Sequence, residues 1–138
     1  MYEYLRKVQY YETDKMGVVH HSNYIRWFEE ARLEMMDKIG YPYKSIEDAG
    51  FICPVLSVSC QYKLSAKFGD IVKVTLHLKE FGNVKHSFFY TVTNPETGDL
   101  YATGESSHCF LNENGRVVSM KKKNPALCEV FESMVEKE

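Results

Sequence analysis

The chain has 138 residues, of which 44% are hydrophobic and 26% charged, and its formal net charge is −2. This length fits one domain spanning residues 1–138, and the balanced composition excludes disordered and low-complexity classes. The slightly acidic charge also excludes a general nucleic-acid binder, which needs a basic surface. A chain this short buries only about two-thirds of its unfolded surface, so we expect it to associate with a second copy.

The sequence carries no sign of membrane insertion or secretion. No apolar run reaches the ~18–20 residues that cross a bilayer, and the first ten residues lack the apolar region of a signal peptide. We therefore expect a cytoplasmic protein with no membrane span. Cys53, Cys60, Cys109 and Cys128 form no C-x-x-C pair and no zinc spacing. We expect these residues to be free, mostly buried thiols.

The first expected elements are a strand and a long helix. Residues 4–11 favour a strand, and residues 12–21 form an irregular segment with a glycine in its middle. A helix is expected over residues 22–39, and the side chain of Ser22 or Asn23 is expected to cap its N-terminus. Its apolar residues recur at three- and four-residue steps, as in an amphipathic helix, at Tyr24, Phe28, Ala31, Met35 and Ile39.

The rest of the chain reads mainly as β-structure. Apolar and polar residues alternate over residues 56–65, which predicts a strand with one buried and one polar face. Further strands are expected over 72–79, 88–92, 100–111 and 117–118, with turn signals between them. Asn124 and Pro125 open a short helix that runs to about residue 135.

This element order predicts an α+β fold. Strands joined by tight turns should be antiparallel, and the long helix should pack on one face of the resulting sheet. One helix cannot cover a sheet of five or six strands. The exposed sheet surface or edge is therefore expected to pair with another copy of the chain.

The segment with the richest chemistry is residues 11–24. It holds Asp14, Gly17, His20 and His21, and it runs directly into the helix N-terminus. Free backbone N–H groups there can stabilise negative charge that develops on an oxygen, as acyl transfer requires. The alternative is structural, since an aspartate before a helix is most often a cap or turn residue, and paired histidines often lie on the surface.

The same segment resembles the signature of the hotdog-fold acyl-CoA thioesterases. The nearest resemblance is to the 4-hydroxybenzoyl-CoA thioesterase family and its bacterial relatives associated with the Tol–Pal system. It covers nearly the whole chain, and its element order agrees with the one expected above. The residues that carry it are Asp14, Gly17, Val18, Val19, His21, Asn23, Tyr24, Tyr62, the run Trp27-Phe28-Glu29-Glu30-Ala31-Arg32, the turn Phe68-Gly69-Asp70 and Lys122-Lys123-Asn124-Pro125.

This resemblance implies a curved antiparallel sheet around one long helix, in dimers or tetramers with active sites at the dimer interface. It implies hydrolysis of an acyl-CoA, with Asp14 as the nucleophile or as the general base on a water. The backbone N–H near His21 would hold the thioester oxygen, and the ring of His21 would orient the carbonyl or assist the departing thiolate. The reaction needs no cofactor, because coenzyme A is part of the substrate. An acyl-carrier-protein thioester is the other candidate substrate.

Several further residues are candidates for substrate binding. Lysines and one arginine, Arg116, are expected near the phosphates of coenzyme A, although charged residues on strands and turns usually form only a solvated face. Glu29 is expected in the pocket wall or paired with a neighbouring arginine on the helix surface. Ser87 would contribute to the neighbouring subunit's site. The complete set of expected substrate-binding residues is Gly17, Val18, Val19, Tyr24, Glu29, Ser87, Lys63, Lys67 and Lys122, with the run Lys121–Lys123 around the last of them.

Two alternatives to thioester hydrolysis stay open. A hotdog hydratase or dehydratase would use a carboxylate and a histidine for proton transfer. A non-catalytic module for acyl ligands or proteins could share the same fold. A metal site formed by Asp14, His20, His21 and Glu12 is disfavoured, because adjacent histidines rarely point at one ion and no H-x-x-x-H occurs.

Overall fold

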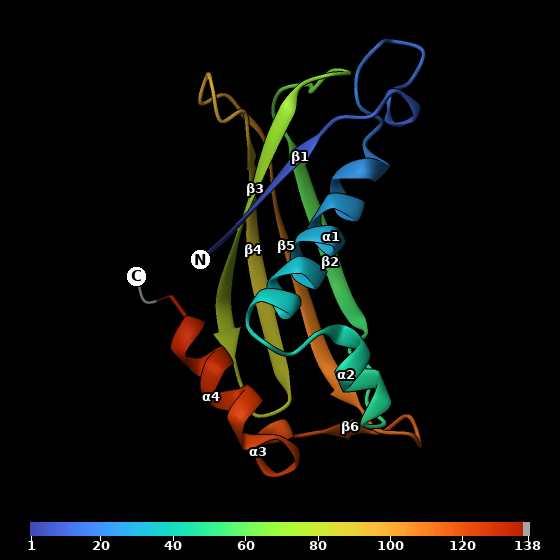
Figure 1. The fold of residues 1–138 in the computed structure, drawn as a ribbon. Coiled ribbons are helices and arrows are strands. Elements are labelled where there is room, and N and C mark those ends of the chain that lie inside the picture. The colour runs from blue at the N-terminus through green and yellow to red at the C-terminus, as the bar shows by residue number, and fades with distance from the viewer. Residues whose placement is uncertain (137–138) are drawn as a thin grey trace.

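A computed structural model describes residues 1–136 of the chain. Six strands form one antiparallel sheet in the order β1-β3-β4-β5-β2, with β6 paired to β5 (Figure 1). The expected α+β architecture is therefore confirmed. The elements are β1 (Tyr2–Lys7), a 3-10 helix (Tyr10–Glu12), α1 (Ser22–Lys38), α2 (Tyr43–Asp48), β2 (Val55–Tyr62), β3 (Ile71–Phe81), β4 (Lys85–Thr93), β5 (Leu100–Leu111), β6 (Val117–Val118), α3 (Met120–Lys123) and α4 (Pro125–Met134).

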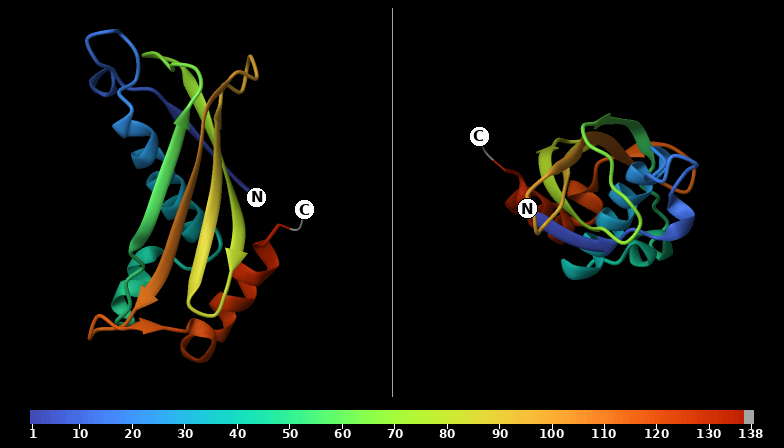
Figure 2. Two further views of the ribbon diagram at one scale, coloured as in Figure 1. Left: turned by 180° about the vertical axis from the view of Figure 1, so that it is seen from behind. Right: turned by 90° about the horizontal axis from the view of Figure 1, so that it is seen from above.

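The long helix α1 lies in the concave face of the sheet, which curves around it (Figure 2). Its apolar stripe is buried as the periodicity predicts, with Trp27, Phe28 and Ala31 fully covered. The ring of Phe28 stacks on that of Tyr90 in β4, with 4.1 Å between the ring centroids. Burial of a side chain as large as phenylalanine stabilises the fold by about 1.5–3 kcal/mol, so this stack anchors the helix to the sheet.

Gly104 in β5 makes the close approach of helix and sheet possible. A Cβ atom at this position would lie 2.4 Å from Cε2 of Phe28 and 2.9 Å from the carbonyl oxygen of Ser59. We expect Gly104→Ala to lower the free energy of unfolding by about 1–3 kcal/mol, because the buried ring has to move. Urea denaturation would measure this loss. Gly82→Ala is the control, since its Cβ meets only the carbonyl of Lys85 at 3.3 Å, and equal losses in the two variants would contradict the explanation.

Strand β2 departs from its prediction. The alternation predicted one buried face, but no residue of β2 is buried within the chain. Val58 is 40% exposed and Leu56 is 50% exposed. The reason is that β2 is an edge strand, which pairs with β5 on one side and has its other side open. The apolar residues of β2 thus form an uncovered surface.

The N-terminal strand is shorter than predicted. It was expected over residues 4–11, but β1 ends at Lys7 and residues Tyr10–Glu12 form a 3-10 helix. The chain turns there because the side chain of Glu12 points inward and accepts a hydrogen bond from the backbone N–H of Gln9. Tyr10 and Tyr11 are left exposed to solvent.

The C-terminal helix is confirmed as α4, and the side chain of Asn124 caps it by accepting a hydrogen bond from the backbone N–H of Leu127. The short helices α2 and α3 were not predicted, because one or two turns carry little periodic signal. Among residues 1–136, no helix is long and apolar enough to cross a membrane.

Candidate active site

The loop that carries Asp14 folds back on itself before it enters α1. Thr13 and Val19 form an antiparallel bridge at its base. The backbone N–H of Asp14 donates to the carbonyl of Val18 at 2.9 Å, and that of Gly17 donates to the carbonyl of Asp14 at 3.0 Å. Gly17 has a φ of +78°, which a glycine adopts without strain. The turn therefore fixes the position of Asp14 and depends on Gly17.

The carboxylate of Asp14 is only partly engaged. Its Oδ1 accepts a hydrogen bond from the backbone N–H of Met16 at 2.8 Å, as in a common aspartate turn. Within residues 1–136, its Oδ2 accepts no hydrogen bond and the side chain forms no ion pair. One carboxylate oxygen thus holds the side chain in place while the other is free to act on a ligand.

Glu12 anchors the loop from inside the protein, a role that the sequence analysis missed. It is 2% exposed, and its carboxylate accepts hydrogen bonds from Arg6, from the backbone of Gln9 and from Nε1 of Trp27. Burial alone would raise its pKa, but these hydrogen bonds outweigh burial and lower it. Arg6 lies 5.6 Å from the centre of the Trp27 ring and also pairs with Glu30. The sequence held a signal for this role, because Glu12 precedes Asp14 closely and Arg6 lies six residues before Glu12.

The start of α1 differs from its prediction. The N-cap residue is His21, and neither Ser22 nor Asn23 caps the helix with its side chain. The Asn23 side chain instead donates to the carbonyls of Glu12 and His20, at 2.9 and 3.2 Å. This buried amide joins the loop to the helix. The backbone N–H of His21 donates to no acceptor within residues 1–136.

Asp14 and His21 line the same cavity, which encloses about 280 Å³. The cavity lies between the N-terminus of α1 and the end of β2. The hydroxyl of Tyr62 donates to the carbonyl of His21 at 3.2 Å, and burial raises its pKa to about 12, so it stays protonated. The complete lining is Asp14, Val19, His21, Tyr24, Tyr62, Lys63, Leu64 and Ser65. Tyr62, Leu64 and Ser65 were not expected as binding residues, because their contact with the cavity depends on how β2 meets the loop.

This arrangement fits acyl transfer. Asp14, with one unengaged carboxylate oxygen, and His21, the N-cap of a 17-residue helix, line the same cavity. The N-terminus of such a helix carries a partial positive charge of about half an elementary charge. A carbonyl placed there would be polarised by the N–H and open to attack from the carboxylate side.

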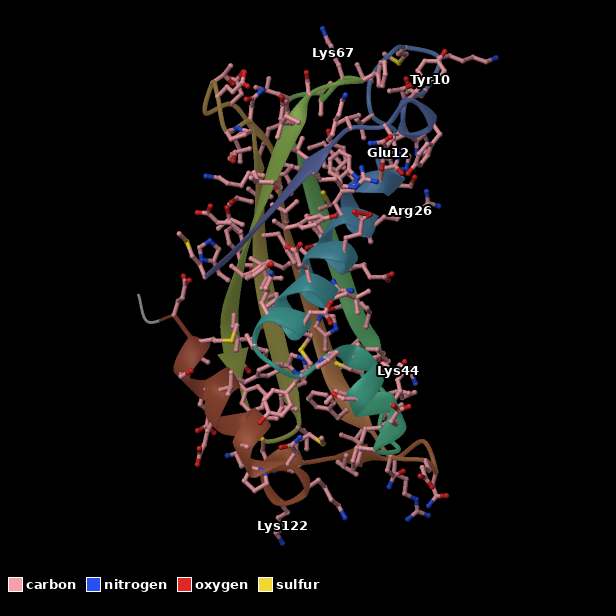
Figure 3. All side chains as sticks on the ribbon, viewed as in Figure 1. Tyr10, Glu12, Arg26, Lys44, Lys67 and Lys122 are labelled. Atoms are coloured by element: carbon pink, nitrogen blue, oxygen red, sulfur yellow. The ribbon has the colours of Figure 1, made fainter. Side chains whose placement is uncertain are left out.

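Of the other residues expected near Asp14, some line the cavity and some do not. Val19, Tyr24 and Lys63 line the cavity. Val18 forms an antiparallel bridge with Lys67, so both lie beside the loop without lining the cavity. The exposed side chain of Lys67 lies at the same end of the molecule as Glu12 (Figure 3).

Three expected residues lie elsewhere in the chain. Glu29 lines a second cavity, of about 380 Å³, beside the C-terminal half of α1. Ser87 lies on β4 opposite Ser107 and lines neither cavity. Lys122 lies on α3, at the end of the molecule opposite the Asp14 loop (Figure 3). Within one chain, Lys122 and Asp14 are therefore not brought together.

No group of three or more histidine, cysteine, aspartate or glutamate side chains is placed to hold a metal ion in the part of the chain that the structure describes. Of the four residues considered for such a site, Glu12 is engaged with Arg6 and Trp27. The rings of His20 and His21 lie side by side, with 4.2 Å between their centroids.

The chain is similar to known thioesterases in both sequence and fold. A family model described as the thioesterase-like superfamily matches residues 8–133. The solved structure of a DHNA-CoA thioesterase from Staphylococcus aureus is 31% identical, with a TM-score of 0.90, and the match covers 96% of this chain and 89% of that chain. A solved Aquifex aeolicus protein is 37% identical, with a TM-score of 0.87 and coverage of 95% and 99%.

A curated relative, a 1,4-dihydroxy-2-naphthoyl-CoA hydrolase of Prochlorococcus marinus, is 27% identical over 118 residues, which are 81% of this chain and 77% of the relative. The hotdog fold implied by the sequence resemblance is confirmed by these structural neighbours, whereas the closer likeness to Tol–Pal-associated enzymes stays a prediction. The family model spans nearly the whole chain, and the chain therefore belongs to the thioesterase-like superfamily.

Proposed function

We propose that this thioesterase hydrolyses an acyl-CoA to the free acid and coenzyme A, with Asp14 and the N-terminus of α1 as its catalytic centre. The observation that carries the proposal is the free carboxylate oxygen of Asp14, which shares one cavity with His21 at the helix start. Relatives named as hydrolases of aromatic acyl-CoA esters support the substrate class. An acyl-carrier-protein thioester presents the same reacting bond and is the alternative substrate.

Two routes are open to Asp14. As a nucleophile it attacks the thioester carbon, the C–S bond breaks, the thiolate of coenzyme A leaves, and water then hydrolyses the acyl anhydride. As a general base it takes a proton from a water that attacks the same carbon. In both routes the backbone N–H of His21 stabilises the negative oxygen, and the ring of His21 orients the carbonyl or gives a proton to the thiolate. Neither route requires a cofactor.

We propose that Lys63 and Lys67 meet the phosphates of coenzyme A. Lys63 lines the cavity, and Lys67 lies beside the loop that carries Asp14. Lys122 and Ser87 could reach this site only from another subunit, because each lies away from it within the chain.

We also propose that the working enzyme is a dimer joined through β2. This edge strand leaves Val55, Leu56, Val58 and Tyr62 40–50% exposed. An edge strand with uncovered apolar residues is a template for pairing with a second chain. In a twofold pair of antiparallel β2 strands, the start of one strand lies beside the end of the other. Two such dimers can further associate into a tetramer.

A charge at the centre of β2 tests the dimer. We expect Val58→Glu to convert the dimer to a monomer, since two like charges would face each other across the twofold axis. Analytical ultracentrifugation would measure the mass. Lys73→Glu is the control, because Lys73 lies on the interior strand β3, away from this edge. A wild-type protein that is monomeric at micromolar concentration would contradict the proposal.

The function itself is tested with a panel of acyl-CoA thioesters, using colorimetric detection of the released thiol. We expect thiol release from at least one aliphatic or aromatic acyl-CoA. If coenzyme A thioesters are inert and an acyl-carrier-protein thioester is cleaved, the carrier is the substrate. If neither releases thiol, the thioesterase proposal fails, and hydration of an enoyl-CoA or binding without turnover becomes the alternative.

A further inference from the structure

The second cavity is an apolar chamber that contains one permanent cation. It lies between the C-terminal half of α1, the start of β2 and the strands β4 and β5, and it encloses about 380 Å³. Its wall is formed mainly by apolar side chains, among them Met35, Met36, Phe88, Phe110 and Phe131. Among residues 1–136, Arg32 is the only lysine or arginine in this wall, and Glu29 is the only carboxylate.

Arg32 donates the first of a series of hydrogen bonds, in which each group donates to the next. Its Nη1 donates to the hydroxyl of Tyr90 at 2.9 Å, which lies 2.5 Å from the hydroxyl of Ser106. Ser106 in turn lies 2.7 Å from Nε2 of His108, and His108 also bonds to the carbonyl of Pro54. A guanidinium only donates and a carbonyl only accepts, so every hydroxyl in the chain donates away from Arg32. The orientation of the guanidinium is thus fixed in advance.

Within residues 1–136, no acidic side chain forms an ion pair with Arg32. Burial lowers the pKa of His86 to about 3 and that of His108 to about 4, so both rings are neutral at neutral pH. Burial raises the pKa of Cys53 to about 12, so its thiol is also neutral. Glu29 lies one helical turn away, and within residues 1–136 neither it nor any other carboxylate forms an ion pair with Arg32.

We propose that this chamber receives the far end of the acyl group and that Arg32 binds a carboxylate there, so that the enzyme prefers ω-carboxyacyl thioesters. A partly buried cation without a counter-ion is stabilised when a ligand supplies one. The planar guanidinium matches a carboxylate with two parallel hydrogen bonds. The apolar wall suits the methylene chain that joins this carboxylate to the thioester.

The proposal rests on the proposed function, because an acyl group held at Asp14 would reach this chamber only in the dimer proposed above. The chamber is lined by Pro54 and Val55 at the start of β2, and the Asp14 cavity by Tyr62 and Lys63 at its end. Antiparallel pairing of two β2 strands about a twofold axis places these ends side by side. An acyl group held at Asp14 of one subunit would then extend into the chamber of the other.

The test compares adipoyl-CoA with hexanoyl-CoA, two six-carbon thioesters that differ in a terminal carboxylate. We expect the wild-type kcat/KM to be about 10- to 100-fold higher for adipoyl-CoA, the range of a charged hydrogen-bonded contact. Arg32→Met should reduce this ratio to about one or below. Tyr90→Phe, which removes the first hydrogen bond of the chain but keeps the cation, should preserve most of the ratio. Glu29→Gln should raise the ratio of the two kcat/KM values, because it removes a negative charge that repels the terminal carboxylate of adipoyl-CoA.

A role of Arg32 in folding alone predicts a different pattern. Arg32→Met and Tyr90→Phe would then lower the melting temperature together and leave the ratio of the two substrates unchanged, which would overturn the proposal. A wild-type preference for hexanoyl-CoA would overturn it as well. If neither thioester is cleaved, the proposed function fails for them. The carboxylate site is then tested by ligand binding without turnover. Adipate should raise the melting temperature of the wild type but not that of Arg32→Met, and hexanoate should raise neither.

Discussion

Replacement of Asp14 by asparagine is expected to lower kcat by about 100- to 10,000-fold, the usual contribution of a positioned acid or base. The side chain keeps its size, and its amide oxygen can still accept the hydrogen bond from the backbone of Met16. The loop should therefore keep its shape while the negative charge is lost. Steady-state thiol release from the best acyl-CoA of the panel measures the effect.

The control for this variant is Met16→Ala, whose side chain is exposed and whose backbone N–H still bonds to Asp14. It should retain activity within about threefold, as a surface substitution does. Full activity of Asp14→Asn would show that the catalytic carboxylate has been misassigned. His21→Ala separates the ring from the backbone: a loss smaller than that of Asp14→Asn indicates that the ring assists a reaction that Asp14 carries.

Isotope labelling distinguishes the two routes open to Asp14. In a single turnover in ¹⁸O-labelled water, the general-base route places the label in the free acid. In the nucleophilic route, attack of water on the aspartyl carbon of the anhydride places the label in Asp14, and the free acid carries an unlabelled oxygen. Mass spectrometry of the acid and of the peptide containing Asp14 reports which carbon received the water.

Replacement of Glu12 by glutamine is expected to have the largest effect on stability. It removes the carboxylate that pairs with the mostly buried Arg6, and loss of one partner of a buried pair costs about 3–5 kcal/mol. We expect the lower end of this range, about 3 kcal/mol, because Arg6 keeps its ion pair with Glu30. Urea denaturation measures the loss. Glu30→Gln is the matched control on the same arginine, with an expected loss of about 1 kcal/mol or less, since Glu30 is partly exposed.

The same pair makes a prediction about pH. The pKa of Glu12 lies below its ordinary value of 4.5, because the bonds from Arg6, Gln9 and Trp27 outweigh the effect of burial. A carboxylate whose pKa is lower in the folded state than in the unfolded state stabilises the folded state at pH values above its unfolded pKa. This contribution is lost as the pH falls through the folded pKa. The difference in stability between wild type and Glu12→Gln should therefore be constant from about pH 5 to 7 and shrink below about pH 4.5. A difference that does not change with pH would contradict this role of the charge.

The sequence by itself determined the class of fold and the segment that carries the chemistry. Period-two alternation defined β3, and three- and four-residue spacing defined α1, because these patterns record which face of each element is buried. The approach of Asp14 to His21 was foreseeable too. The two residues are seven positions apart, and Gly17 between them allows the chain to turn back.

Only the tertiary structure decided which residues hold this segment and which surfaces stay uncovered. Glu12 reads as the first residue of an irregular segment until the fold brings Arg6 and Trp27 to it. The alternation in β2 predicts an apolar face, but whether another element of the same chain covers that face depends on the width of the sheet relative to one helix. The unbalanced charge of Arg32 is likewise invisible in the sequence, where Glu29 is an equally good partner. Local patterns record burial and turning, whereas pairing between distant residues depends on the complete arrangement of the sheet.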